Sequence, residues 1–181
     1  MQMKHKDGYP IWISLLVEPV RYHDGNIIES RSIVIDITEH KLAEKKLQKK
    51  THDLNERVKE LNCLYGISKL VEQQDISLAE ILQGIVDLIP PSWQYPEITC
   101  ARVIIQGREW KTKNFPETIW KQASDIKVHG ELSGNLEVYY LEEKPEIDEG
   151  PFLREERKLI TAIAGLAGRI VERKQAVVGI K

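Results

Sequence analysis

Cysteine is scarce in this chain, and long apolar runs are missing. The 181 residues contain two cysteines, Cys63 and Cys100, which are too few for a disulfide framework, so we expect free thiols in a reducing compartment. No segment approaches the ~18 uninterrupted apolar residues of a membrane-spanning helix. The first residues, Met-Gln-Met-Lys-His-Lys, are not followed by the apolar run of a signal peptide. The sequence therefore predicts a cytoplasmic protein without membrane insertion.

The chain also lacks a large excess of positive or negative charge. Lys plus Arg number 26 and Asp plus Glu number 28, which gives a formal net charge of −2. Nucleic-acid binding requires a concentrated basic surface, so no nucleic-acid partner is expected. The cysteines and histidines do not have metal-ligand spacing, and no glycine-rich loop with an ATP-binding context occurs. We therefore expect no metal, no cofactor and no catalytic site.

The N-terminal segment shows the two-residue periodicity of β-strands. Apolar side chains occupy every second position of a first run: Ile11, Ile13, Leu15 and Val17. A second alternating run covers residues 27–37, and His23-Asp24-Gly25-Asn26 has the composition of the turn between the two. An earlier turn signal, Lys6-Asp7-Gly8, indicates a further strand within residues 1–5. Because a two-stranded hairpin is marginal alone, this segment is predicted to be the end of a larger sheet.

A long charged helix is predicted after residue 38, with Thr38 as its N-cap. Apolar side chains recur along it at heptad spacing: Leu47, Leu54, Val58, Leu61 and Tyr65. Two companion positions of the same seam hold the polar residues Glu44 and Thr51. The pattern favours a short parallel coiled coil. The alternative is an amphipathic helix that packs on its own domain.

The rest of the chain carries signals for both helices and strands. Ser77-Leu78-Ala79-Glu80 is a capping box that opens a helix, and Pro90-Pro91 ends that helix. Four strands are expected, at 98–105, 109–113, 125–132 and 135–141. The last two should be joined by a turn at Ser133-Gly134, and a final helix should run from Pro151 to near Lys174. This order of elements predicts an α+β fold with helices against one sheet face.

Residues 5–48 resemble the C-terminal part of a PAS domain. The resemblance rests on the following positions: Lys6-Asp7-Gly8, 11–17, Pro19, Asp24-Gly25, Asp36-Ile37-Thr38-Glu39, Lys41 and Ala43-Glu44. It implies an antiparallel hairpin remnant of a PAS sheet, truncated before the ligand pocket, so no PAS ligand is implied. It also implies that Asp36 and Thr38 form a motif that transmits a signal into the following helix.

Residues 61–174 resemble a compact GAF-like domain, of the kind found beside PAS domains in sensor histidine kinases. The resemblance rests on the following positions: Leu64-Tyr65-Gly66-Ile67-Ser68, 99–105, 134–139, Phe152, Glu155-Glu156 and 159–170. The two resemblances together imply four parts of the chain. These are a truncated PAS domain at 1–38, a long helical coiled-coil linker at 39–60, an antiparallel GAF-like sheet with packed helices at 61–174, and a tail at 175–181.

Aromatic side chains are the candidates for a ligand site in the GAF-like segment. Only residues 115–124 separate its middle strands, which is too little chain to roof a roomy cavity. A small ligand, where one binds, is expected to contact Trp110, Trp120 and Tyr139. The alternative is that these side chains belong to the core.

These features predict a non-catalytic signal-relay module of a two-component-type protein. We expect a parallel homodimer formed through the seam of the helix, with other signalling domains or a histidine kinase as possible partners. One alternative is a GAF sensor that binds a small ligand directly, and another is a gene remnant of a sensor histidine kinase. A third gives His52 a phosphotransfer role, because His52-Asp53-Leu54 resembles a phosphoacceptor motif.

Overall fold

The computed structural model describes residues 2–21 and 27–179 and confirms the α+β fold. The chain divides into two compact units, Met1–Leu54 and Asn55–Lys181, and the division falls within one helix. Each unit contains an antiparallel sheet, with three strands in the first and four in the second. The predicted turn at 23–26 lies outside the described residues.

The first unit contains strands β1 (Gln2–Lys4), β2 (Pro10–Arg21) and β3 (Ile27–Asp36), in that order across the sheet. Strand β2 pairs antiparallel with both neighbours, so the predicted hairpin strands and the short upstream strand are confirmed. Six apolar side chains of the two long strands are exposed: Leu15, Leu16, Val17, Ile33, Val34 and Ile35. Since successive side chains point to opposite faces, both faces of this ladder carry exposed apolar surface.

Helix α1 (Thr38–Glu72) begins two residues after β3 ends and confirms the long predicted helix. Its sequence is rich in Leu, Lys and Glu, contains no proline and has a single glycine, Gly66, so intrinsic propensity favours the helix throughout. Its last part belongs to the second unit, where Cys63 and Ile67 are buried.

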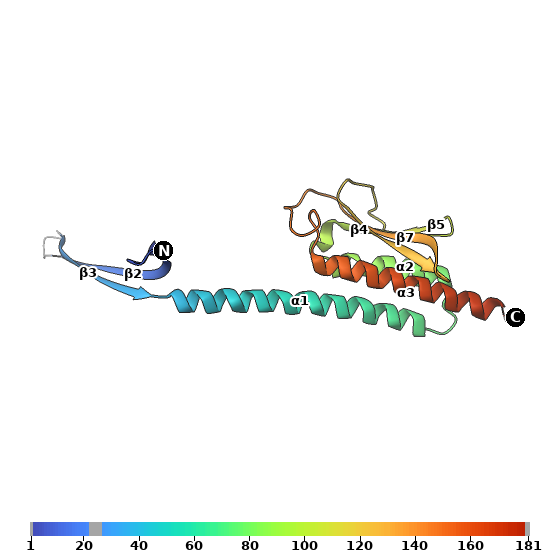
Figure 1. Ribbon diagram of the computed structural model, residues 1–181, viewed down its shortest axis with the longest axis horizontal. Helices are drawn as coiled ribbons and strands as arrows, with labels where there is room; N and C mark the ends of the chain where they lie inside the picture. The colour runs from blue at the N-terminus through green and yellow to red at the C-terminus, as the bar shows by residue number, and fades with distance from the viewer. Residues whose placement is uncertain (1, 22–26, 180–181) are drawn as a thin grey trace. The chain divides into compact units, whose positions relative to one another are not determined.

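The sheet of the second unit has the strand order β5 (Arg108–Lys111), β4 (Thr99–Ile105), β7 (Glu131–Tyr140) and β6 (Lys121–Val128). Helices α2 (Leu78–Leu88) and α3 (Arg154–Gly179) lie against one face of it, and the part of α1 in this unit lies beyond those helices (Figure 1). The core lies between sheet and helices. Its largest buried side chains include Ile81, Leu82, Ile85, Trp93, Ile126, Leu136, Tyr140, Phe152, Ile160 and Ile163.

The predicted turn at Ser133-Gly134 is wrong. Strands β6 and β7 are joined instead by His129 and Gly130, whose φ angles of 54° and 82° are those of a two-residue type I′ turn. Gly134 lies inside β7, opposite Ile105 of β4 and Ile126 of β6. A glycine within a strand often marks a close approach of another backbone, and sequence alone does not separate that use from a turn.

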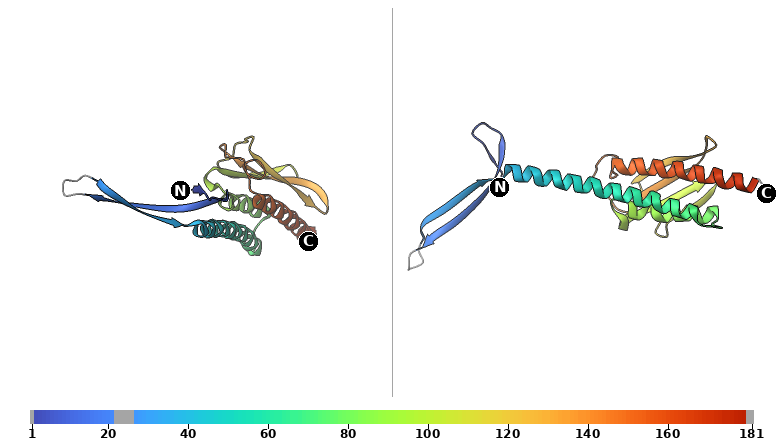
Figure 2. Two further views of the ribbon diagram at one scale, coloured as in Figure 1. Left: turned by 60° about the vertical axis from the view of Figure 1, so that its left-hand side comes forward. Right: turned by 90° about the horizontal axis from the view of Figure 1, so that it is seen from below.

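Helices α1 and α2 come close together because each places a leucine over a glycine of the other. Leu88 of α2 lies over Gly66 of α1, and Leu70 of α1 lies over Gly84 of α2. A Cβ atom at Gly84 would lie 2.6 Å from a Leu70 methyl carbon, so the Leu70 side chain occupies the space that a side chain at position 84 would need. The right-hand view of Figure 2 shows α1 running over α2 in this region.

The predicted ends of α2 are confirmed, and those of α3 are not, since α3 begins at Arg154 rather than at Pro151. Ser77 Oγ accepts the Glu80 N–H at 3.2 Å, and Glu80 Oε2 accepts the Ser77 N–H at 2.8 Å, which completes the capping box. Helix α2 then stops before Pro90. Helix α3 continues past the predicted end near Lys174 to Gly179, because the intervening residues include no glycine or proline.

Gly134→Ala should destabilise the second unit by about 3 kcal/mol, since its Cβ would lie 1.8 Å from the Ile104 carbonyl oxygen. Gly165→Ala is the matched control, because the nearest atom to its Cβ is a flexible Arg169 side-chain nitrogen at 3.6 Å. We expect this helical substitution to stabilise by up to about 1 kcal/mol. Urea unfolding of the full chain measures both, and equal effects would contradict the assigned register.

Candidate functional site

The start of α1 is tied to the sheet of the first unit by Asp36 and Thr38. Asp36 Oδ1 accepts the Thr38 N–H at 2.8 Å, and Thr38 Oγ1 accepts the Trp12 N–H at 2.9 Å. The Ile37 N–H donates to the Trp12 carbonyl oxygen at 2.8 Å. The central strand β2 is therefore hydrogen-bonded to both residues that lie between β3 and the body of α1.

The prediction that Thr38 is the N-cap of α1 is wrong. The Thr38 hydroxyl accepts from strand β2, and the Ile37 carbonyl accepts the first helical hydrogen bond, from Lys41 N–H at 2.9 Å. Hydrogen bonds from the side chain and backbone of Thr38 lower the pKa of Asp36. The stabilisation from Asp36 is therefore present above its ordinary pKa, and it is lost as the pH falls through the lowered value.

The Trp12 side chain adds a second contact between sheet and helix. The Lys45 ammonium lies 5.7 Å from the centre of a Trp12 ring, within the range of a cation–π interaction. Trp12 thus contacts α1 through both its backbone and its indole. A change in the position of β2 would act directly on the first turns of α1.

The five predicted seam residues of α1 are all exposed. Their exposed fractions lie between 53% and 66%, and the residues are Leu47, Leu54, Val58, Leu61 and Tyr65. At 3.6 residues per turn, positions repeated every three and four residues share one face of a helix. The helix therefore carries a stripe of large apolar side chains, which we call the α1 seam, and the described residues do not cover it.

The opposite face of α1 packs on the second unit. Residues half a turn round from the seam include Glu56, Cys63, Ile67 and Leu70, and the first three are buried. The Cys63 thiol lies 3.8 Å from the Leu88 carbonyl oxygen, and the Leu70 side chain packs over Gly84. The end of α1 is thus apolar on two opposite faces, of which one is buried within the chain. The alternative of the sequence analysis, a helix that packs on its own domain, is therefore found in the last part of α1, and the coiled coil stays a prediction.

No protein-family model matches the chain, and no curated protein matches it.

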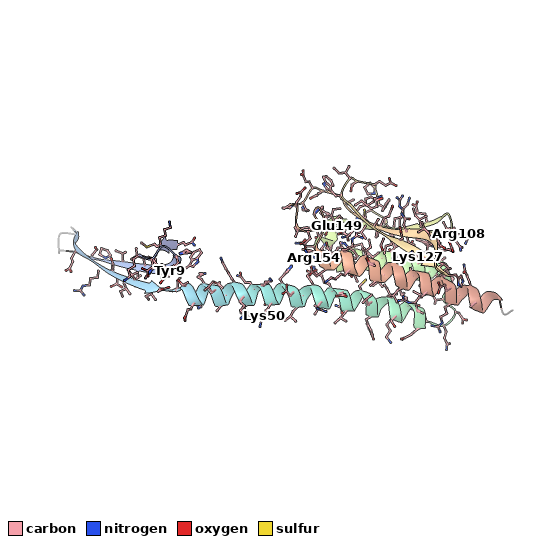
Figure 3. The ribbon with its side chains drawn as sticks, in the orientation of Figure 1. Tyr9, Lys50, Arg108, Lys127, Glu149 and Arg154 are labelled. Carbon is pink, nitrogen blue, oxygen red and sulfur yellow. The ribbon has the colours of Figure 1, made fainter. Side chains whose placement is uncertain are left out.

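The three aromatic candidates for a ligand site lie in three different places. Trp110 lines a hollow of about 340 Å³ formed with residues of α2 and α3, and Trp120 lines another of about 290 Å³ near the start of α3. Arg108 and Glu149, which line the first and second hollow, lie at opposite ends of the unit (Figure 3). Tyr139 is buried on β7 and lines neither hollow. The fold therefore does not bring these three side chains to one site.

A charged cluster lies on the face of the sheet turned away from the helices, and the sequence did not predict it. Arg102 of β4 donates from Nε and Nη2 to Glu137 Oε2 of β7, at 2.9 Å and 2.5 Å. The Tyr139 hydroxyl donates to the same oxygen at 2.9 Å. Residues 112–120, which join β5 to β6, add Glu117, 2.6 Å from Arg102 Nη1, and Phe115, whose ring centre lies 5.0 Å from the guanidinium. These contacts hold residues 112–120 against the sheet.

The partners of Glu137 determine its charge. Burial alone would raise the pKa of Glu137, but hydrogen bonds from Arg102 and Tyr139 outweigh burial and lower it. Lys121 Nζ, 3.4 Å away, and the Asn135 amide, 2.9 Å away, bond its second oxygen. Glu137 is therefore an ionised and fully bonded structural group rather than an acid or base poised for proton transfer.

The remaining nucleophilic candidates are His52 and the two cysteines. His52 lies exposed on α1, and both cysteines are free and buried. Burial raises the pKa of Cys100 to about 11 and also raises the pKa of Cys63, so neither is a thiolate at neutral pH. In the described part of the chain, no helix has the length and apolarity to cross a bilayer, and no three His, Cys, Asp or Glu side chains are grouped as metal ligands.

Thr38→Val should weaken the junction between β2 and α1 by about 1 kcal/mol, because it removes the acceptor of the Trp12 N–H. We expect faster hydrogen exchange at the Trp12 amide in this variant. Thr38→Ser keeps the hydroxyl and should leave the exchange rate near that of the natural chain. The same protection in both variants and the natural chain would contradict the described junction.

Arg102→Met should destabilise the second unit by about 3 kcal/mol at pH 7, because it leaves the Glu137 carboxylate buried without its main partner. The loss should be smaller near pH 4, where Glu137 of the variant takes up a proton while Glu137 of the natural chain, with its lowered pKa, stays ionised. Arg108→Met, at an exposed position of β5, is the control. A destabilisation that does not change with pH would contradict the assigned ion pair.

Proposed function

We propose that the chain is a non-catalytic signal-relay module of a two-component-type protein and acts in the cytoplasm. In this proposal the first unit is the end of a PAS-like sheet, and the second is a compact GAF-like domain. The observation that carries the proposal is the α1 seam, whose exposed side chains lie on the same helix that is bonded to β2 at one end and buried at the other. Such a helix is a mechanical connection between two folded units.

The proposed partner of the seam is the seam of a second copy, in a parallel homodimer. Burying large apolar side chains contributes about 1.5–3 kcal/mol each when burial is complete, so five of them support association. A parallel pair related by a two-fold axis brings each seam residue against its own copy. Leu54, Val58, Leu61 and Tyr65 would form the apolar part, and Thr51 and Glu44 would loosen the seam towards the first unit.

The proposed mechanism is a change in the pairing or rotation of α1. A displacement of β2 is passed to the first turn of α1 through Asp36, Thr38 and Trp12. The helix contains no proline, so a rotation at its start reaches the docked part. Helix α3, which packs on β6 and on α2, would then carry the change onward to signalling domains or a histidine kinase.

A second candidate function is the direct sensing of a small ligand by the GAF-like unit. The hollow of about 340 Å³ beside Trp110 favours this function, because Leu78, Leu82 and Val171 give it apolar walls and Arg108 gives it a cation. A small molecule that co-purifies with the chain, or visible absorbance of the purified protein, would support it. Trp110→Ala should then abolish co-purification.

The double substitution Leu54→Glu and Leu61→Glu should make the chain monomeric, because it places four carboxylates in the seam of a dimer. Sedimentation velocity measures the change. Leu42→Glu with His52→Glu is the matched control, since both positions are exposed on α1 but lie off the seam. A dimer that survives the seam substitutions, or a natural chain that is monomeric, would contradict the proposed function.

A further inference from the structure

Glu156 is a buried carboxylate at the start of α3. It is 2% exposed, and its two oxygens bond three elements of the second unit. Oε1 accepts the Gln94 N–H at 2.7 Å and the Tyr140 hydroxyl at 3.0 Å, and Oε2 accepts the Leu153 N–H at 2.7 Å. Glu156 therefore joins the first turn of α3 to β7 and to the loop before β4.

Glu56 brings a second buried carboxylate to the same loop from α1. It is 8% exposed, and its Oε1 lies 3.0 Å from Lys59 Nζ. The same ammonium donates to the Trp93 carbonyl oxygen at 3.3 Å. Trp93 and Gln94 are consecutive, so neighbouring backbone groups of one loop bond the α1 pair on one side and Glu156 on the other.

The charges around this loop do not balance. Glu56 and Lys59 face it from α1, Tyr95 lies within it, Tyr140 faces it from β7, and Glu156 faces it from α3. Two ammonium groups lie near it: Lys59, which is paired with Glu56 and is 30% exposed, and Lys144, which lies 5.4 Å from the centre of the Tyr95 ring. Lys144 is paired with Glu142 at 3.2 Å, so each of these two cations already has a carboxylate partner other than Glu156. Burial raises the pKa of Glu156 against the opposing hydrogen bonds of Leu153, Gln94 and Tyr140, and the negative charge of Glu56 adds to the rise.

We propose that Glu56 and Glu156 couple α1 to α3 by electrostatic repulsion across the Trp93–Gln94 loop, so that the seating of α1 on the second unit depends on the charge of this pair. The proposal rests on the proposed function, because it names the contact through which the incoming helix acts on the outgoing one. When both carboxylates are ionised, the repulsion between them opposes the packing of α1 on the rest of the second unit. Uptake of a proton by Glu156, or withdrawal of Glu56 as α1 moves, relieves it.

The sign of the pH dependence follows from Glu156. Since its pKa is raised in the folded chain, its contribution to stability is complete below the ordinary pKa of a glutamate and is lost as the pH rises through the raised value. Glu56→Gln removes the nearby charge and keeps an oxygen that can accept from Lys59. The Glu156 pKa should therefore fall in this variant, and less stability should be lost as the pH rises.

The test is a carbon-13 NMR titration of the Glu156 carboxyl group in the full-length chain, with and without Glu56→Gln. We expect a lower pKa in the variant. Between pH 4 and pH 8 the unfolding equilibrium constant of the variant should rise less than that of the natural chain, by about tenfold for each unit of the pKa change. The change with pH is compared, because loss of the Glu56–Lys59 pair alters the stability of the variant at both pH values. Glu60→Gln, one turn further along α1, is the control and should not move the titration of Glu156.

An unchanged Glu156 titration in Glu56→Gln would overturn the coupling. The measurement is repeated in a chain that also carries Leu54→Glu and Leu61→Glu, which removes the proposed dimer. A coupling that persists there while the natural chain proves monomeric would leave the inference standing and reject the relay by dimerisation. A natural chain that is dimeric, in which Glu56→Gln leaves the Glu156 pKa unchanged, would reject the inference and leave the relay by dimerisation standing. The two failures are therefore distinguished.

Discussion

The structure depends on the two-sided character of helix α1. One side, with Cys63 and Ile67, is buried on the second unit, and the opposite side carries the exposed α1 seam. A helix that only had to dock would be polar on its outer face, as surface helices are. The packing within the second unit and the proposed association of two copies therefore use opposite faces of the same helix.

Polar contacts connect the helix to its surroundings at two places, in addition to the apolar packing of its last part. At its start, Asp36 and Thr38 bond the junction to β2, and further along, Glu56 and Lys59 reach the loop that also bonds Glu156. Such contacts are directional and short in range, so a rotation of the helix breaks or strengthens them before apolar packing is lost. This arrangement suits a connector that responds to small movements.

Periodicity and capping signals predicted most elements from the sequence, because they depend on neighbouring residues. The hairpin strands, the Ser77 capping box and the long helix α1 are examples. The sequence failed where distant backbone decides the outcome. Gly134 is required by the Ile104 carbonyl rather than by a turn, and the hydroxyl of Thr38 is taken by Trp12. The Arg102–Glu137 ion pair and the hydrogen bond from Gln94 to Glu156 join residues far apart in the chain, so no local pattern indicates them.

Cysteine cross-linking of the seam tests the account most directly. In a parallel pair, Leu61 of one copy faces Leu61 of the other, so Leu61→Cys should give a disulfide-linked dimer under mild oxidation. The two natural cysteines are buried and should not interfere. The account predicts rapid cross-linking of Leu61→Cys and slow cross-linking of Leu42→Cys, which is exposed but off the seam. Equal rates at the two positions, or no linked dimer at Leu61→Cys, would contradict a parallel pairing through α1.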